Sequence, residues 1–269
     1  LDVDGLNGAA TTISYGKPGD DVFVGDWDGN GTDTFAVRRG NIFYLRNRLG
    51  SGAADVVIGY GTHGDEVLVG DWDGNGTDTP GMYRPSNGLA YLTNDTPPDG
   101  GVGVGDPDLT FFFGIPGDEV VVGDWDGDGF DTLGIHRGGK MFLTNVNGTS
   151  IAEWDFFFGT PGDIAFGGDA DGDGRDSVFL YRPSSGFVYF TTEIPIDPSG
   201  AAATAGTLFF GEPTDRFVVG DWDGDGIDTV GVFRPPSTTH FLRNSNTTGP
   251  GDITFDFGSS TWIPVAGDF

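Results

Sequence analysis

The sequence contains no cysteine, only two methionines, and only 13 lysine and arginine residues among 269. Without cysteine, the chain has no disulfide framework and no thiol chemistry. Its 41 Asp and Glu residues give a formal net charge of −28, which argues against nucleic acid as a partner because phosphate binding needs basic patches. No apolar run is long enough to span a bilayer, so we expect no membrane insertion.

Glycine and aromatic residues are abundant instead, with 49 Gly and 13% Phe, Trp and Tyr. Runs rich in Ala, Leu and Lys with a 3.6-residue period, which are typical of helices, are absent. This composition predicts an all-β protein in which many turns join short, well-packed strands.

One acidic string recurs along the chain. It reads Gly-Asp-Trp-Asp-Gly-(Asn/Asp)-Gly, precedes an Asp-Thr pair, and begins at Asp26, Asp71, Asp124 and Asp221, while a variant copy without the Trp begins at Asp169. Each copy places three or four carboxylates within eight residues. Like charges this close repel one another unless a cation lies among them. Oxygen ligands at positions 1, 3 and 5, with a glycine at position 6, match the requirements of Ca²⁺.

The repeat unit contains four short strands. In the fifth copy they cover residues 217–220, 230–233, 240–243 and 253–258, and each is bounded by Gly, Pro, Asn or Asp. A period of about 50 residues with four strands per unit predicts a β-propeller of four-stranded blades. Fourth strands such as 111–113 do not alternate with polar residues, as expected of strands that are covered on both faces.

The spacing of the acidic strings predicts the number of blades. Successive strings lie 45, 53, 45 and 52 residues apart, so short and long units alternate, which favours an even number and therefore six blades. We interpret residues 1–269 as a single propeller domain with a half-unit at 1–20, units at about 21–64, 65–117, 118–162, 163–214 and 215–261, and a half-unit at 262–269. We expect the two half-units to pair as a sixth blade shared by the termini. Alternatively, the half-units belong to a longer array and self-assemble with neighbouring copies.

These units resemble the FG-GAP/VCBS repeat family, whose best-known members form the calcium-binding blades of integrin α-subunit propellers. The resemblance covers nearly the whole chain. It depends on Gly-Asp-Trp-Asp-Gly-Asp-Gly, on the following Val- or Ile-containing strand with its Arg, and on a Phe/Tyr-Gly-x-x-Gly-Asp signal before each unit. It implies a Ca²⁺ site in the hairpin between the first and second strands of each blade, with about five ions in all, one per complete repeat.

The family pattern places side-chain ligands at loop positions 1, 3 and 5, a main-chain oxygen at position 7 and a final Asp at position 9. The matching side chains are Asp26, Asp28 and Asn30; Asp71, Asp73 and Asn75; Asp124, Asp126 and Asp128; Asp169, Asp171 and Asp173; Asp221, Asp223 and Asp225. The matching carbonyls belong to Thr32, Thr77, Phe130, Arg175 and Ile227. The last Asp lies at position 8 instead, as Asp33, Asp78, Asp131, Asp176 and Asp228. We include it in the predicted metal site, and whether it binds directly or through water stays open.

Two other interpretations of the acidic loops compete with this one. An EF-hand needs a Glu at position 12 followed by a helix, whereas this position holds Val37, Met82, Ile135, Leu180 and Val232. A bare hairpin turn needs only one Asp-Gly or Asn-Gly pair, not acidic positions repeated in five copies. We therefore predict bound metal, in a structural role, because a closed shell of protein ligands leaves no open position for a substrate.

Tryptophan and arginine also recur at fixed positions. Trp27, Trp72, Trp125 and Trp222 hold the second loop position, where we expect packing between blades rather than sugar stacking on exposed rings. One arginine lies thirteen residues after the first Asp of every loop: Arg39, Arg84, Arg137, Arg182 and Arg234. We expect each to make a two-bond contact with a carboxylate or with loop carbonyls, and a set of ligand pockets is the alternative.

Together these patterns predict a non-enzymatic, extracellular propeller that Ca²⁺ stabilises and that binds a carbohydrate or a cell-surface protein. The long loops 94–108 and 193–206 are the most individual parts of the chain, so we expect a partner there. One alternative is a structural segment of a cell-surface stalk or filament. Another is a polysaccharide-active enzyme, but His63, His136 and His240 share no position in the unit, and the sequence offers no catalytic candidate.

Overall fold

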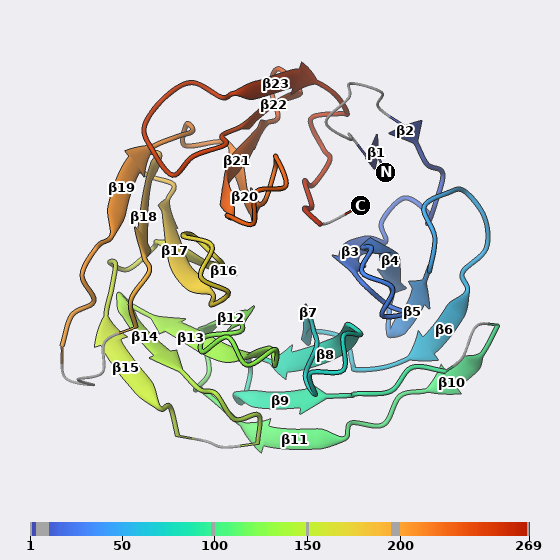
Figure 1. The fold of residues 1–269 in the computed structure, drawn as a ribbon. Helices are drawn as coiled ribbons and strands as arrows, with labels where there is room; N and C mark the ends of the chain where they lie inside the picture. Colours follow the sequence, from blue (N-terminus) through green and yellow to red (C-terminus); the bar gives the residue numbers. More distant parts are fainter. Residues whose placement is uncertain (1, 4–10, 98–99, 149–150, 195–199, 268) are drawn as a thin grey trace.

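The structure is a computed structural model that describes residues 2–3, 11–97, 100–148, 151–194, 200–267 and 269. Figure 1 shows five sheets arranged radially around a central axis, each contributing its first strand to the inside of the ring. The described residues form strands, turns and bends, and no helix capable of crossing a membrane occurs among them. The predicted all-β class and the propeller arrangement are confirmed.

Each blade is an antiparallel meander from the inside of the ring to its rim. The first blade consists of β3 (Asp21–Gly25), β4 (Thr34–Arg39), β5 (Ile42–Leu45) and β6 (Val56–Gly59); the second of β7 (Glu66–Gly70), β8 (Thr79–Arg84), β9 (Leu89–Leu92) and β11 (Leu109–Phe112). The third consists of β12 (Glu119–Gly123), β13 (Thr132–Arg137), β14 (Lys140–Leu143) and β15 (Trp154–Phe157). The fourth consists of β16 (Ile164–Gly168), β17 (Ser177–Arg182), β18 (Phe187–Thr191) and β19 (Gly206–Phe209); the fifth of β20 (Arg216–Gly220), β21 (Thr229–Arg234), β22 (Thr239–Leu242) and β23 (Ile253–Asp256).

The prediction of six blades was wrong, because the described residues form five. At the place of the sixth, β1 (Asp2–Val3) and β2 (Thr11–Thr12) make only a two-stranded sheet, and the described residues of the C-terminal segment form no strand. The segment still fills the gap between the fifth and first blades (Figure 1): the rings of Phe269 and Phe35 lie 5.0 Å apart. A full blade also needs the hairpin of the first and second strands, and the described parts of the two terminal segments do not form it.

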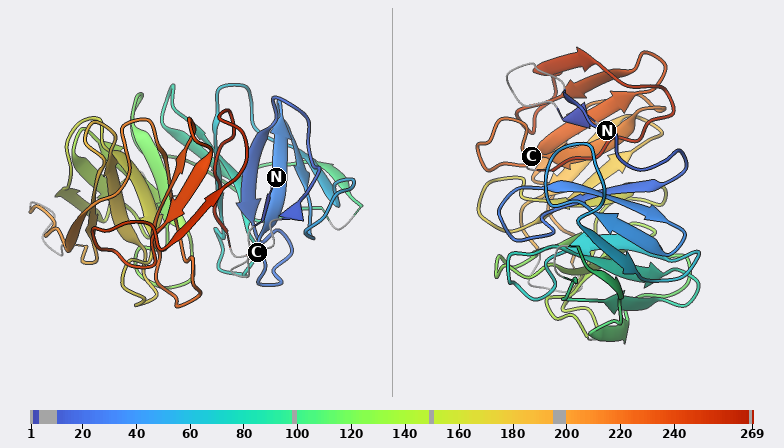
Figure 2. Two further views of the ribbon diagram at one scale, coloured as in Figure 1. Left: turned by 90° about the horizontal axis from the view of Figure 1, so that it is seen from above. Right: turned by 90° about the vertical axis from the view of Figure 1, so that its right-hand side faces the viewer.

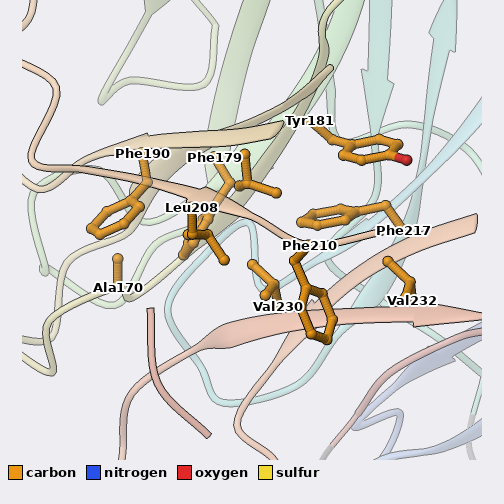
Figure 3. Close-up of a cluster of buried hydrophobic side chains, with 10 residues drawn as sticks. Ala170, Phe179, Tyr181, Phe190, Leu208, Phe210, Phe217, Val230 and Val232 are labelled. Carbon is orange, nitrogen blue, oxygen red and sulfur yellow. The ribbon is translucent and has the colours of Figure 1, made fainter. Parts of the chain in front are cut away.

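Hydrophobic cores lie between neighbouring blades rather than within one. The second strands β4, β8, β13, β17 and β21 are buried along five of their six residues, so both faces are covered. Figure 3 shows one such core, in which Phe179 and Leu208 of the fourth blade face Val230 and Phe217 of the fifth. The stacked rings of Tyr181 and Phe217, 4.9 Å apart, join the same two blades. Two-sided burial explains why these strands lack polar alternation.

The loops between third and fourth strands reach back to the rim of the preceding blade. The long loop of the second unit contributes β10 (Val102–Val104), which pairs in parallel with β6. The long loop of the fourth unit bridges in parallel to β15, where Ala201 pairs with Phe157. In the short loop of the fifth unit, Thr248 Oγ1 instead accepts a hydrogen bond from Phe209 N on β19 at 2.9 Å. The alternating unit lengths therefore reflect two ways of covering an exposed strand edge.

The two ends of each inner hairpin define the two faces of the ring. In the first blade, Gly25 pairs with Thr34 beside the acidic loop, whereas Asp21 pairs with Arg38 at the opposite end. The other blades repeat this register, so all acidic loops lie on one face of the ring and the repeated arginines on the other. The edge-on view in Figure 2 shows loops projecting on both sides of the blades.

Candidate metal centre

Each acidic loop folds around the carboxylate of its first Asp. In the third loop, Asp124 Oδ1 accepts hydrogen bonds from Gly127 N at 2.8 Å and Asp128 N at 3.1 Å, and its Oδ2 accepts from Gly129 N at 2.8 Å. Gly127 and Gly129 have φ values of 76° and 85°, a region that side chains disfavour, which explains the glycines at positions 4 and 6. The first Asp of the other four loops accepts main-chain bonds in the same way.

The carboxylates at positions 1, 3 and 5 converge. Their oxygens lie within 4.8 Å of one another in three loops: Asp124, Asp126 and Asp128; Asp169, Asp171 and Asp173; Asp221, Asp223 and Asp225. In the first and second loops the third member of the set is an amide, Asn30 or Asn75, whose Oδ1 accepts a bond from the main chain two residues on. The structure thus brings together the predicted side-chain ligands at positions 1, 3 and 5 in the third, fourth and fifth loops, and in the second loop Asp73 interacts with Asp71 and Asn75.

Crowding of these groups changes their protonation equilibria. Burial raises the pKa of Asp126, and the neighbouring charges of Asp128 and Asp124 raise it further. Burial and the charge of Asp71 likewise raise the pKa of Asp73. At Asp221, burial raises the pKa, but hydrogen bonds from four main-chain N–H groups outweigh it, so the pKa lies below its usual value. A cation among these carboxylates would remove the repulsion.

The donor set fits Ca²⁺. It consists only of carboxylate, amide and carbonyl oxygens, which hard cations prefer, and it contains neither thiolate nor imidazole. The side chains at positions 1, 3 and 5 would hold the ion together with the carbonyl at position 7, which belongs to Thr32, Thr77, Phe130, Arg175 or Ile227. Bound Ca²⁺ would supply positive charge that ties the loop ends together.

The aspartate at position 8 contacts the loop of the preceding blade in four of the five units. Asp78 Oδ2 accepts a hydrogen bond from the main-chain N–H of Asp26 in the preceding blade at 2.9 Å, and Asp78 N donates to Asp26 O at 2.8 Å. The same reciprocal pair joins Asp131 to Asp71, Asp176 to Asp124 and Asp228 to Asp169. We call each of these contacts an inter-blade clasp. Asp33, the fifth residue of this type, lies against Gly267 of the C-terminal segment.

The clasp accounts for the glycine before each of the first four loops. A Cβ atom added to Gly25 would lie 2.9 Å from Asp78 Oδ2, and one added to Gly70 would lie 2.7 Å from Asp131 Oδ2. Burial raises the pKa of the clasp carboxyls, although the main-chain N–H bond opposes it, to about 7 in Asp78, about 6 in Asp131 and about 7 in Asp176. These carboxyl groups therefore belong to the interface between blades.

Three of the four loop tryptophans are buried, as the packing interpretation predicts. Trp27, Trp72 and Trp125 are at most 3% exposed. The indole N–H of Trp27 donates to Thr34 O at 3.0 Å, closing the hairpin behind the loop. Trp222 in the fifth blade is only half-buried, because the described residues place no full blade beside it. Sugar stacking on Trp27, Trp72 or Trp125 is therefore excluded.

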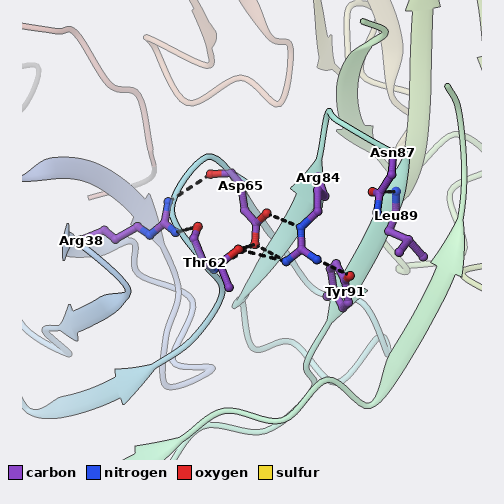
Figure 4. Close-up of polar contacts among 7 residues, drawn as sticks. All are labelled: Arg38, Thr62, Asp65, Arg84, Asn87, Leu89 and Tyr91. Atoms are coloured by element: carbon purple, nitrogen blue, oxygen red, sulfur yellow. Dashed lines mark hydrogen bonds and ion pairs between the residues drawn. The ribbon is translucent and has the colours of Figure 1, made fainter. Parts of the chain in front are cut away.

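The repeated arginines make the predicted two-bond contacts with carboxylates. In Figure 4, Arg84 Nε donates to Asp65 Oδ1 at 2.7 Å and Arg84 Nη2 donates to Asp65 Oδ2 at 2.9 Å. Arg84 also lies over the ring of Tyr91, 4.7 Å from its centroid. The other pairs are Arg39 with Asp20, Arg137 with Asp118, Arg182 with Asp163 and Arg234 with Asp215. Each Asp is the last residue of the Gly-x-x-x-Asp turn that enters the blade.

The polar pair of His136 and Glu119 was not predicted from the sequence. His136 Nδ1 lies 2.8 Å from Glu119 Oε2, and Gly139 N donates to His136 Nε2 at 3.3 Å, so Nε2 is an acceptor and Nδ1 carries the proton. Glu119 Oε1 accepts from Ala165 N of the next blade at 3.1 Å. No sequence signal marks this pair, because the equivalent position holds Arg38, Tyr83, Tyr181 and Phe233 in the other blades. With both ring nitrogens engaged in the buried interior, His136 joins blades and has no free nitrogen for proton transfer.

Comparison with known proteins adds a distant structural similarity. No family model and no curated protein match the sequence. Among solved structures, the chain is similar to one in the crystal structure of BBS1N in complex with ARL6DN, soaked with lead, with a TM-score of 0.43 and 11% sequence identity. The match covers 85% of this chain and 66% of that one. This similarity is too low to carry a functional argument, so the fold class stands on the sheet arrangement.

Proposed function

We propose that this protein is a non-enzymatic, extracellular β-propeller that Ca²⁺ stabilises and that acts as a binding or adhesion module. The observation that carries the proposal is the convergence of carboxylates at positions 1, 3 and 5 of successive loops on one face of the ring. Ca²⁺ at the millimolar concentrations found outside cells saturates even weak sites of this kind, which favours a secreted or cell-surface location. The resemblance to FG-GAP/VCBS repeats, noted above, supports the same assignment.

Several features support a role in binding rather than catalysis. The polar groups of the repeated arginines and of His136 are already paired within the protein. The long loop of the second unit leaves a cavity of about 250 Å³ beside β6, lined by Asp95, Pro97, Asp106 and other residues. Individual loops on a regular scaffold are frequent places of recognition. We assign this loop as the first region in which to search for a carbohydrate or surface-protein ligand.

The binding function is tested with a glycan array and a panel of cell-surface proteins, probed with and without Ca²⁺. We expect a ligand whose binding is lost in chelator and weakened when Asp95 and Asp106 are replaced by Asn. Absence of any ligand, together with end-to-end polymers in a native mass measurement, would instead favour the structural stalk. The packing of Phe269 against Phe35 argues against polymers, because it places the C-terminal segment beside the first blade of the same chain.

A further inference from the structure

We propose that the aspartate at position 8 is a positioning residue for the metal loop of the preceding blade, so that each of the first four loops is completed by the blade that follows it. This inference rests on the calcium function proposed above. The four positioning residues are Asp78, Asp131, Asp176 and Asp228, and they hold the loops that begin at Asp26, Asp71, Asp124 and Asp169.

The clasp fixes the residue at the centre of the loop. Asp131 holds both main-chain groups around Asp71: its Oδ2 accepts from Asp71 N at 2.8 Å, and its N–H donates to Asp71 O at 2.8 Å. The Asp71 carboxylate in turn accepts bonds from Asn75 N at 3.1 Å and Gly76 N at 2.6 Å. A shift of Asp131 therefore moves the main chain that aims the first metal ligand. Groups that orient a ligand in this way tune metal affinity by about 10–100-fold.

The contact engages Asp131 Oδ2 with the preceding loop rather than with its own. Asp131 follows the third loop, yet its carboxylate lies at the main chain of the second loop, and the third loop's cluster consists of Asp124, Asp126 and Asp128. The structure thus assigns position 8 to the neighbouring site. The family pattern, in which the last acidic residue closes its own loop, predicts the opposite assignment, so the two can be distinguished by experiment.

The fifth loop is the exception. Among the described residues, no hydrogen bond like those from Asp26 N, Asp71 N, Asp124 N and Asp169 N to a position-8 carboxylate is found at Asp221 N. All three of its carboxylate side chains, Asp221, Asp223 and Asp225, are exposed, whereas the first Asp of the third and fourth loops, Asp124 and Asp169, is half-buried. We infer that the fifth loop binds Ca²⁺ more weakly than the four loops that are clasped.

Hydrogen–deuterium exchange, read by mass spectrometry on the full chain during a Ca²⁺ titration, reports on each loop separately. In the wild type, peptides covering residues 71–77 and 124–130 should gain protection at Ca²⁺ concentrations about tenfold or more below those needed for residues 221–227. Equal midpoints for the fifth loop and the clasped loops would overturn the inference. This comparison needs no substitution and therefore cannot fail through misfolding.

A substitution then tests the direction of the coupling. In Asp131→Ala, the midpoint for residues 71–77 should rise about tenfold or more, while that for residues 124–130 changes less than twofold. Asp131→Asn retains an oxygen acceptor for Asp71 N and should restore most of the affinity of the second loop. A larger loss in residues 124–130 than in 71–77 would show that Asp131 serves its own loop and would overturn the inference.

These outcomes separate the inference from the function on which it rests. If no loop of the wild type gains protection on addition of Ca²⁺, the proposed calcium function fails. If the loops are protected by Ca²⁺ but Asp131→Ala acts on its own loop, the calcium function stands and only the positioning role fails.

Discussion

Arg182 and Asp163 are joined by two hydrogen bonds of 2.7 Å each, from Nε to Oδ1 and from Nη2 to Oδ2. The guanidinium group of Arg182 also lies over Tyr189, 4.5 Å from the ring centroid, and Asp163 accepts a further bond from Thr160 N. The pair thus ties the turn that enters the blade to the end of its second strand. Because every blade repeats it, this contact sets the geometry of the face opposite the acidic loops.

We predict that loss of this pair destabilises the fourth blade. In Arg182→Ala, the carboxylate of Asp163, whose side chain is 1% exposed, loses its charged partner and keeps only the bonds from Thr160. Removing one member of a fully buried pair costs about 3–5 kcal/mol, and because the Arg182 side chain is 26% exposed we expect about 1–2 kcal/mol in the free energy of unfolding. Lysine cannot form both bonds, so Arg182→Lys should recover only part of the loss. Urea denaturation measures the free energy of unfolding of both variants.

The matched control is Arg175→Ala in the exposed part of the fourth acidic loop. It removes a cation of the same size and keeps the main-chain carbonyl that we assign to the metal. A loss within about 0.5 kcal/mol is expected for an exposed position without such partners. An equal loss in Arg175→Ala and Arg182→Ala would mean that general charge balance, rather than the ion pair, determines stability.

The repeat itself made much of this structure predictable. A fixed spacing of thirteen residues between the first Asp of a loop and an arginine such as Arg182 indicated a contact repeated in every blade, and the structure shows it. Burial of Trp125 followed from the same regularity. The contacts and burial of residues within one unit can thus be predicted from the sequence, because each residue is subject to the same local constraints in every copy.

Contacts between units could not be predicted from the repeated sequence. The sequence places Asp131 after its own loop, whereas the fold carries its carboxylate to Asp71, sixty residues earlier. The number of blades also escaped prediction, because alternating lengths reflect how Val102–Val104 and Thr248 cover preceding rims, not the symmetry of the ring. Both features concern packing between units, which the composition of a single unit does not specify.

A second prediction concerns the turn between β21 and β22. Thr238 has a φ value of 55°, and it is the sole non-glycine residue with positive φ in the described chain. A β-branched side chain is strained there, and Gly186 occupies the equivalent place in the fourth blade. We expect Thr238→Gly to stabilise the protein by about 1 kcal/mol in thermal unfolding. Gly186→Ala is the reverse control and should destabilise, since its Cβ would lie 2.5 Å from Gly211 O.

Removal of metal should lower the melting temperature. A site held at a hundred times its dissociation constant contributes about 2.7 kcal/mol, and each kcal/mol shifts the midpoint of a domain of this size by about 2–4 °C. Even one saturated loop therefore predicts a decrease of about 5 °C or more in EDTA. Calorimetry with EDTA, and with EDTA already saturated by Ca²⁺ as the control, measures the shift. An unchanged midpoint would contradict structural calcium.

The clasp carboxyls predict an unusual pH dependence for the metal-free protein. The pKa values of Asp78 and Asp176, about 7, lie above the value near 4 of an unfolded Asp. Their contribution to stability is therefore complete below the unfolded pKa and is lost as the pH rises through about 7. We expect the melting temperature in EDTA to fall between pH 5 and pH 8. Asp176→Asn, which cannot ionise, should flatten the curve, and an unaltered slope would show that other groups control it.

The last prediction distinguishes a metal site from a simple turn by the difference in melting temperature between a double variant and the wild type, which should change sign when Ca²⁺ is added. Burial raises the pKa of Asp126, and repulsion from the carboxylates of Asp128 and Asp124 raises it further. Without Ca²⁺, replacing Asp124 and Asp126 together by Asn removes that repulsion while keeping oxygen acceptors for the main-chain N–H groups of the loop. The double variant should then melt at the same temperature as the wild type in EDTA, or a few degrees higher.

With Ca²⁺ the order should reverse. The wild type gains the binding free energy of the third loop, whereas the variant lacks two of its charged ligands and gains little. The double variant should therefore melt about 5 °C or more below the wild type, by calorimetry under the same conditions. Glu153→Gln, which changes a carboxylate of the same blade outside the loop, should show no such Ca²⁺ dependence. If the melting temperature of the double variant differs from that of the wild type by the same amount with and without Ca²⁺, the acidic string forms a turn and no metal site. Only a bound cation makes clustered negative charge favourable.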